Sequence, residues 1–116
     1  MRRFKFEPRK RLHSAAEFRA CQQRGKRFAD EFFSVSVLHN GETHPRLGLA
    51  IATRICGGSV TRNRLKRLTR ESFRLHQHAL PALDITVAAR DAAARAAPLE
   101  LRSSLGRLWQ RIARKA

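Results

Sequence analysis

The order of helical and strand patterns along the chain predicts an α+β fold, a single domain in which a small, mostly antiparallel sheet of about four strands packs with three helices. Two observations support this prediction. The chain has 116 residues, of which 42% are apolar, so it can bury one core but is too short for two ordinary domains. Its patterns run helix, strand, strand, helix, strand, helix, with room for another short strand near residues 26–29.

The charge of the chain restricts its partners. Lys and Arg total 25 and Asp and Glu total 9, a formal net charge of +16 at pH 7, which calls for a polyanion nearby. Residues 1–12 are interpreted as a basic N-terminal arm ahead of a single domain over residues 13–116. No apolar run approaches the roughly 20 residues of a membrane helix, and the N-terminus lacks the apolar stretch of a signal peptide. Because Cys21 and Cys56 are isolated, we expect a cytoplasmic protein with reduced thiols.

The sequence of the first part of the domain predicts a helix followed by two strands. Ser14-Ala15-Ala16-Glu17 fits a capping box, in which a cap serine is followed three residues later by a glutamate. A helix should therefore run from about Ala15 to Arg24, and Gly25 should stop it. Residues 32–38 and residues 46–52 are rich in strand formers, and we expect these two strands to pair with each other.

The sequence of the second part of the domain predicts a long helix, a central strand and a last helix. Ser59 or Thr61 can cap a helix that runs to about Ala79. Asp84–Arg90 is short, apolar and rich in β-branched residues, which is typical of a central strand. Pro98 suits the first position of the last helix. The apolar residues of that helix recur at helical spacing and are Leu101, Leu105, Leu108 and Ile112, with Trp109 beside them in the core.

The long helix carries the residues with the clearest chemistry. On a helical wheel its core face consists of Leu65, Leu68, Ser72, His76 and Ala79, flanked by Arg62 and Arg64. A basic stripe lies opposite the core face and consists of Asn63, Lys66, Arg67, Arg70 and Arg74. Cations one turn apart can meet successive phosphates of a nucleic acid, and the amide of Asn63 can touch a base edge or a ribose hydroxyl. If about six cations of this helix, with Arg62 and Arg64 included, each neutralise one phosphate, log affinity should fall against log salt with a slope of roughly −4 to −5.

The segment Val60–Arg74 resembles the signature helix of the protein component of bacterial ribonuclease P, which has Arg-Asn-Arg, an apolar residue, Lys-Arg, and an Arg three residues further on. Four other segments resemble the same family in the same order. They are the opening from Arg11-Leu12 through Glu17-Phe18 to Gly25, then His44–Leu49, Asp84–Arg90 and Leu105–Trp109. The resemblance covers about residues 10 to 113, and five segments in order are far more specific than one basic helix.

The resemblance implies the protein subunit of a ribonucleoprotein endoribonuclease that matures the 5′ end of tRNA. The family's protein binds a catalytic RNA, one protein monomer to one RNA, and the pair removes the 5′ leader of precursor tRNA. The chemistry is expected in the RNA, with Mg²⁺ held mainly by the RNA and with no organic cofactor. The RNA-subunit contacts expected in this chain, extended by the last stripe residue, are Arg62, Asn63, Arg64, Lys66, Arg67, Arg70 and Arg74.

The resemblance also implies a cleft for the single-stranded leader, between the first helix and one face of the sheet. Its residues here are Phe18, Gln22, Ser34 and Ser36, and some family members carry aromatic residues at the positions of Gln22 and Ser36. The implied fold is ribosomal protein S5 domain 2-like, with a left-handed β-α-β crossover that includes the basic helix. The general rule predicts the opposite hand, which is found in about 98% of such units.

The residues themselves predict neither an active site nor a metal site within the protein. The nine carboxylates are scattered, and the adjacent Asp30 and Glu31 would point to opposite faces of a strand. His76 and His78 do not share a helical face. From the residues alone, two alternatives stay open: a ribosomal or general structured-RNA-binding protein, and a DNA-binding regulator. The regulator would normally dimerise, and the sequence has no heptad seam.

Overall fold

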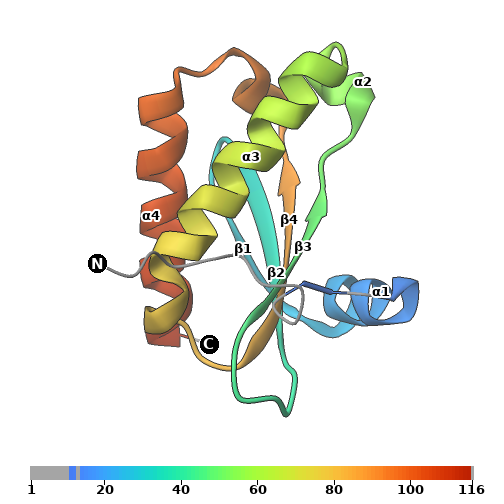
Figure 1. Ribbon diagram of the computed structural model, residues 1–116, viewed down its shortest axis with the longest axis vertical. Coiled ribbons are helices and arrows are strands. Elements are labelled where there is room, and N and C mark those ends of the chain that lie inside the picture. Colours follow the sequence, from blue (N-terminus) through green and yellow to red (C-terminus); the bar gives the residue numbers. More distant parts are fainter. Residues whose placement is uncertain (1–10, 13, 116) are drawn as a thin grey trace.

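The computed structural model describes residues 11–12 and 14–115, apart from the side chains of residues 55 and 56, and is shown in Figure 1. Residues 1–10 of the expected arm lie outside the described residues. In chain order the elements are α1 Ala15–Arg24, β1 Lys26–Ala29, β2 Phe33–His39, β3 Arg46–Ala50, α2 Thr53–Cys56, α3 Ser59–His76, η2 Gln77–Ala79, β4 Leu83–Ala89, η3 Asp91–Arg95 and α4 Pro98–Lys115. Three long helices and a four-stranded sheet confirm the expected α+β fold.

The strand order of the sheet is β1-β2-β4-β3. Strand β2 is antiparallel to both β1 and β4, whereas β3 is parallel to β4, so the sheet is mostly antiparallel as predicted. The expected pairing of residues 32–38 with residues 46–52 is wrong, because β4 lies between β2 and β3. Residues 83–87 of β4 are all buried, and a strand that is covered on both faces belongs in the interior of a sheet.

The connection from β3 through α3 to β4 is left-handed. In Figure 1, α3 lies in front of the sheet, β3 and β4 both run upwards, and β4 lies to the left of β3. A right-handed connection would place β4 to the right of β3, as in about 98% of such units. The resemblance to the family therefore predicted the hand of this crossover correctly, and the general rule predicts it wrongly.

The two faces of the sheet have different roles. In β2, Phe33, Val35 and Val37 are buried and belong to the hydrophobic core. Figure 1 shows α3 and α4 together on one side of the sheet, with α1 apart from them. Ser34 and Ser36 alternate with the core residues and therefore point to the face that α1 partly covers. One face thus carries the core, and the other carries small and polar side chains.

Trp109 joins α4 to α3 within the core, as expected for a core residue. Its indole Nε1 donates a hydrogen bond to Ser72 Oγ at 2.9 Å, and its ring meets Phe73 edge-on with centroids 6.1 Å apart. Phe73 and Thr69 are fully buried although the helical wheel did not place them in the core, and Ala79 is exposed although the wheel did. The reason is that α3 contacts both the sheet and α4, which buries a wider arc of the helix.

Helix α1 begins as predicted but ends for a different reason. Ser14 Oγ accepts from the Glu17 backbone N–H at 3.1 Å, and the Glu17 side chain accepts from the Ser14 backbone N–H at 3.3 Å, which confirms the capping box. Gly25 has extended backbone, with φ of −76°, and not the left-handed conformation of a glycine cap. Glycine is required here because a Cβ would lie 2.3 Å from the carbonyl oxygen of Cys21.

Helix α3 begins and ends differently from the prediction. Its N-cap is Gly58, whose φ of +156° favours glycine, and no side chain caps the helix. Neither Ser59 nor Thr61 is therefore the cap, since both already lie within the helix. The regular helix ends at His76, and the chain continues as the short 3₁₀ helix η2 to Ala79.

Candidate nucleic-acid interface

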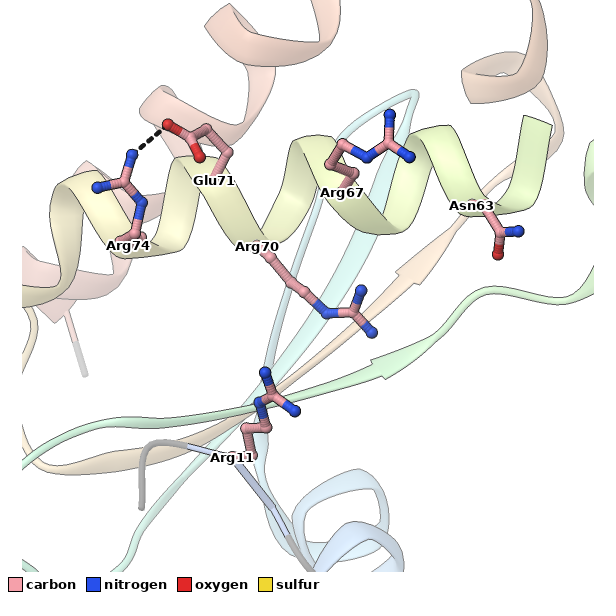
Figure 2. A pocket seen from close by; sticks show the side chains of 6 residues that line it. All are labelled: Arg11, Asn63, Arg67, Arg70, Glu71 and Arg74. Atoms are coloured by element: carbon pink, nitrogen blue, oxygen red, sulfur yellow. Dashed lines mark hydrogen bonds and ion pairs between the residues drawn. The ribbon is translucent and has the colours of Figure 1, made fainter. Parts of the chain in front are cut away.

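Four residues of the basic stripe line one hollow on the surface of α3, shown in Figure 2. This basic hollow has a volume of about 400 Å³ and is lined by Asn63, Arg67, Arg70 and Arg74 of the stripe, together with Glu71 and Arg11. Arg11 lies beside β3, where it forms a parallel bridge with Leu47, and the Leu12 N–H donates to the Leu47 carbonyl at 3.1 Å. The side chains of Arg70 and Arg11 extend towards each other in Figure 2. The sequence placed Arg11 only in the arm, because a helical wheel contains no tertiary information.

Two further expected contact residues are half-buried on α3. Arg62 Nε donates to the carbonyl oxygen of Ile51 at 2.8 Å. This hydrogen bond links the first turn of α3 to the residue that directly follows β3. Burial lowers the pKa of Lys66, and the charges of Arg62 and Arg70 lower it further. A phosphate beside Lys66 would offset this repulsion and favour the charged amine. Arg62 thus supports the fold, while Lys66 has a charge that an anion would stabilise.

Arg64 lies apart from the basic hollow. It lines a separate hollow between α3 and α4, which also includes Arg67, Leu68, Glu71, Pro98 and Arg102. The seven expected RNA contacts therefore do not all line one hollow. Asn63, Arg67, Arg70 and Arg74 share the basic hollow, whereas Arg62 is bound to Ile51 and Arg64 lines the other hollow with Pro98 and Arg102 of α4.

Glu71 modifies the charge at one end of the basic hollow. It is the single acidic residue within α3, and its carboxylate forms an ion pair with Arg74 in the next turn, drawn as a dashed line in Figure 2. The pairing offsets the charge of Arg74. Arg67 and Arg70, in contrast, form no ion pair within the described residues.

The expected leader residues lie on and beside α1. The ring of Phe18 is half-buried and packs directly on Gly48 of β3, where an added Cβ would lie 2.8 Å from the ring. Gln22 is exposed and Ser34 is half-buried, so both are accessible. Ser36 is only 5% exposed. The structure therefore places three of the four side chains within reach of a ligand, while Ser36 lies in the covered part of the sheet.

A row of small residues crosses the sheet on the same face. In register across the four strands, this open row consists of Ala29, Ser34, Ala88 and Ala50. All four are exposed or half-buried, so α1 does not cover them. Of these four residues, only Ser34 is among the residues expected from the sequence. The signal for the others was the small side chain at alternate strand positions, but aligning them requires the strand order.

A partly buried ionic network links α1 to the sheet on the same face as the open row, two rows of paired residues away from it. The Arg46 guanidinium binds Asp84 through two hydrogen bonds of 2.8 and 2.9 Å and contacts Glu17 of α1 at 3.0 Å. Asn40 Nδ2 also donates to Asp84 at 3.1 Å. The hydrogen bond to Asp84 is the main cause of the raised pKa of Arg46. An aspartate in an apolar strand needs such a partner, and this was the sequence signal for the network.

Cys21 is the buried residue of α1, and its Sγ donates to the carbonyl oxygens of Ser36 and Asp84 in the sheet, each at 3.2 Å. Burial raises the pKa of this thiol, so we expect native Cys21 to react with iodoacetamide at pH 8 at least about tenfold more slowly than in urea. The variant Cys56→Ser isolates this thiol for the measurement. Because the folded state holds the proton of this thiol more tightly, the contribution of Cys21 to stability is fully present below the unfolded pKa of 9.0 and is lost as the pH rises above it. Equal rates in the native and unfolded protein would contradict the prediction.

The fold and the two surfaces define a small, strongly basic α+β protein of the RNA-binding class. None of the helices in the described part of the chain is both long and apolar enough to cross a membrane. The sequence model of the family "Ribonuclease P" matches residues 6–113. The chain belongs to the ribonuclease P protein family, whose members act with an RNA subunit in tRNA processing. The match favours this role over the general RNA-binding and DNA-binding alternatives.

Individual relatives agree with this assignment. The ribonuclease P protein component of Aliivibrio salmonicida (strain LFI1238) is 34% identical over 111 residues, which cover 96% of this chain and 95% of the relative. The structure of the Staphylococcus aureus RNase P protein is 32% identical, with a TM-score of 0.82 over 90% of this chain and 94% of that chain. The RNase P protein from Thermotoga maritima, in complex with 1-(4-fluorophenyl)-2-thiourea, is also 32% identical, with a TM-score of 0.81 over 88% and 99%.

Proposed function

We propose that this chain binds the catalytic RNA of ribonuclease P along α3 and the single-stranded 5′ leader of precursor tRNA along the open row of the sheet. The basic hollow is the observation that carries the proposal. Three arginines of α3 and Arg11 line one site in which Glu71 is the single acid. Such a concentration of like charges is stabilised by a polyanion, and the stripe spacing suits a phosphate backbone.

The open row suits a flexible single strand. No side chain in the row is larger than serine, so the floor is flat, and four strands spaced by about 4.8 Å give it a length of about 14 Å. Phe18 stands on α1 over Gly48 of the neighbouring row, and aromatic rings stack with unpaired bases. Gln22 offers a donor and an acceptor for base edges. These features support the proposal that the leader lies between α1 and the sheet.

We assign the cleavage chemistry to the RNA and the positioning of substrate to this chain. The residues that the structure describes contain no group of three or more His, Cys, Asp or Glu side chains that could hold a metal ion. The arginine-lined basic hollow does not fit a Mg²⁺ ion, whereas RNA phosphates supply the hard oxygen ligands that Mg²⁺ prefers. We propose one protein monomer per RNA, acting in the cytoplasm, where the thiol of Cys21 stays reduced.

Reconstitution with the cognate catalytic RNA tests the proposed function. Cleavage of precursor tRNA is measured against Mg²⁺ concentration, with and without the protein. We expect the protein to lower the Mg²⁺ concentration needed for cleavage, because its cations offset repulsion between the two RNAs. A competition with duplex DNA should leave the complex with structured RNA intact. An unchanged Mg²⁺ requirement would refute the proposed function.

Phe18 is expected to act only on substrates that carry a leader. The variant Phe18→Leu keeps an apolar side chain over Gly48 but removes the ring, and stacking contributes about 1–3 kcal/mol per base. We therefore expect the reconstituted enzyme to bind leader-bearing precursor tRNA about tenfold more weakly, with unchanged affinity for tRNA without a leader. Equal losses for both substrates would place Phe18 outside the leader site. Urea unfolding of the variant checks that the fold is retained.

A further inference from the structure

A second basic surface lies between α3 and α4. Figure 1 shows the two helices close together at the C-terminal end of α3 and further apart towards the start of each helix. The space between them contains a hollow of about 470 Å³, lined by Arg64, Arg67, Leu68, Glu71, Pro98 and Arg102. A smaller hollow of about 130 Å³ shares Leu68, Glu71 and Arg102 and continues to Ser72, Leu75 and His76. We call the two together the α3–α4 groove.

The side chains of the groove combine positive charge with an apolar floor. Arg64 and Arg67 on α3 and Arg102 on α4 are all exposed, and within the described residues none of the three forms an ion pair. Their charge is opposed by Glu71, which is already paired with Arg74. Leu68 and Pro98 supply apolar surface between the arginines. Arginine suits phosphates, and an apolar floor suits the flat face of a base.

We propose that the α3–α4 groove binds an unpaired segment of the catalytic RNA, with phosphates on Arg64 and Arg102 and one base on Leu68 and Pro98. This inference rests on the proposed function. Arg67 lines both the groove and the basic hollow, so an RNA strand on the stripe continues directly into the groove. The Glu71 carboxylate is placed to accept a hydrogen bond from a base amino group.

The position of the groove favours the catalytic RNA, and not the leader, as the molecule that binds there. The open row lies on the face of the sheet that α1 partly covers, whereas α3 and α4 pack on the core face. A leader held along the open row therefore does not run into the groove. The continuity with the basic hollow assigns the groove to the RNA subunit.

The test compares three variants that each lower the net charge by one. Arg102→Gln removes one proposed phosphate contact, and Leu75→Glu places a carboxylate in the groove at a residue that is 52% exposed. Arg107→Gln is the control, because Arg107 is also exposed on α4 but does not line the groove. Affinity for the catalytic RNA is measured by filter binding at several KCl concentrations. Urea unfolding checks that each variant is folded.

We expect Arg102→Gln and Leu75→Glu to weaken binding of the catalytic RNA about tenfold, since a hydrogen bond to a charged group is lost or opposed. Arg102→Gln should also make the salt slope shallower by about 0.7, while Arg107→Gln changes the affinity by less than about twofold. Equal effects of all three variants would overturn the proposal that RNA binds in the α3–α4 groove. A loss confined to binding of precursor tRNA by the reconstituted enzyme would overturn its assignment to the RNA subunit. If the unmodified protein fails to bind the catalytic RNA, the proposed function itself fails.

Discussion

Replacing Asp84 with alanine is expected to lower the free energy of unfolding by about 3–5 kcal/mol. The side chains of Asp84 and Arg46 are only 8% and 15% exposed, and two hydrogen bonds join them. Alanine would leave the Arg46 guanidinium in the protein interior without its main partner, and Asn40 Nδ2 would lose one of its two acceptors and keep the carbonyl oxygen of His44. A domain of this size has a total stability of about 5–15 kcal/mol, so the loss is a large fraction. Urea unfolding measures it through the fluorescence of the single, buried Trp109.

A double variant separates the lost attraction from the cost of an unpaired charge. Replacing Arg46 with Met and Asp84 with Leu together removes both charges and keeps most of the volume. We expect this pair to cost less than Asp84→Ala alone, because no buried charge is left without a partner. Glu17 would lose its contact with Arg46, but its side chain is 34% exposed and can be hydrated. A loss below about 1 kcal/mol for Asp84→Ala would show that the network does not hold α1 on the sheet.

The features of the fold that depend on local patterns could be predicted from the sequence. The capping box at Ser14 and the start of α4 at Pro98 are both observed. Each depends only on residues within a single turn of its own helix. The strand pairing could not be predicted in this way. The apolar patterns of residues 32–38 and 46–52 suit direct pairing as well as pairing through a third strand. Only the burial of β4 on both faces indicates that β4 lies between these two strands. The hand of the crossover came from the family resemblance and not from physical rules.

The candidate site was predictable to the extent that it lies on one helix. Asn63, Arg67 and Arg70 share a hollow because a helix of regular period brings them together. Arg11 reaches that hollow from a distant part of the chain, and Arg102 reaches the groove from α4, so neither could be found with a helical wheel. The wheel places Arg62 at the flank of the core face and the family resemblance implies an RNA contact, but neither predicts that its guanidinium donates to the carbonyl oxygen of Ile51.

Replacing both Arg67 and Arg70 with glutamine is expected to weaken binding to the catalytic RNA by at least about 100-fold. Each charge-assisted contact with a phosphate contributes about 1.5–3 kcal/mol, so two together exceed the 2.7 kcal/mol that corresponds to about 100-fold. The salt slope should become shallower by about 1.5, since two fewer counterions are released. Both side chains are exposed, so folding should be unaffected. Filter binding across a series of KCl concentrations measures the affinity and the slope together.

The control for this double variant is the replacement of Arg107 and Arg114 by glutamine, which changes the net charge equally. Both arginines are exposed on α4 and do not line the basic hollow. We expect the control to weaken binding by less than about threefold, because charges beyond a Debye length of about 8 Å are screened at physiological salt. If both double variants weaken binding equally, the affinity depends on total charge and not on the stripe. A large effect of the first variant alone identifies α3 as the surface that binds the RNA subunit, since only the positions of the lost charges differ.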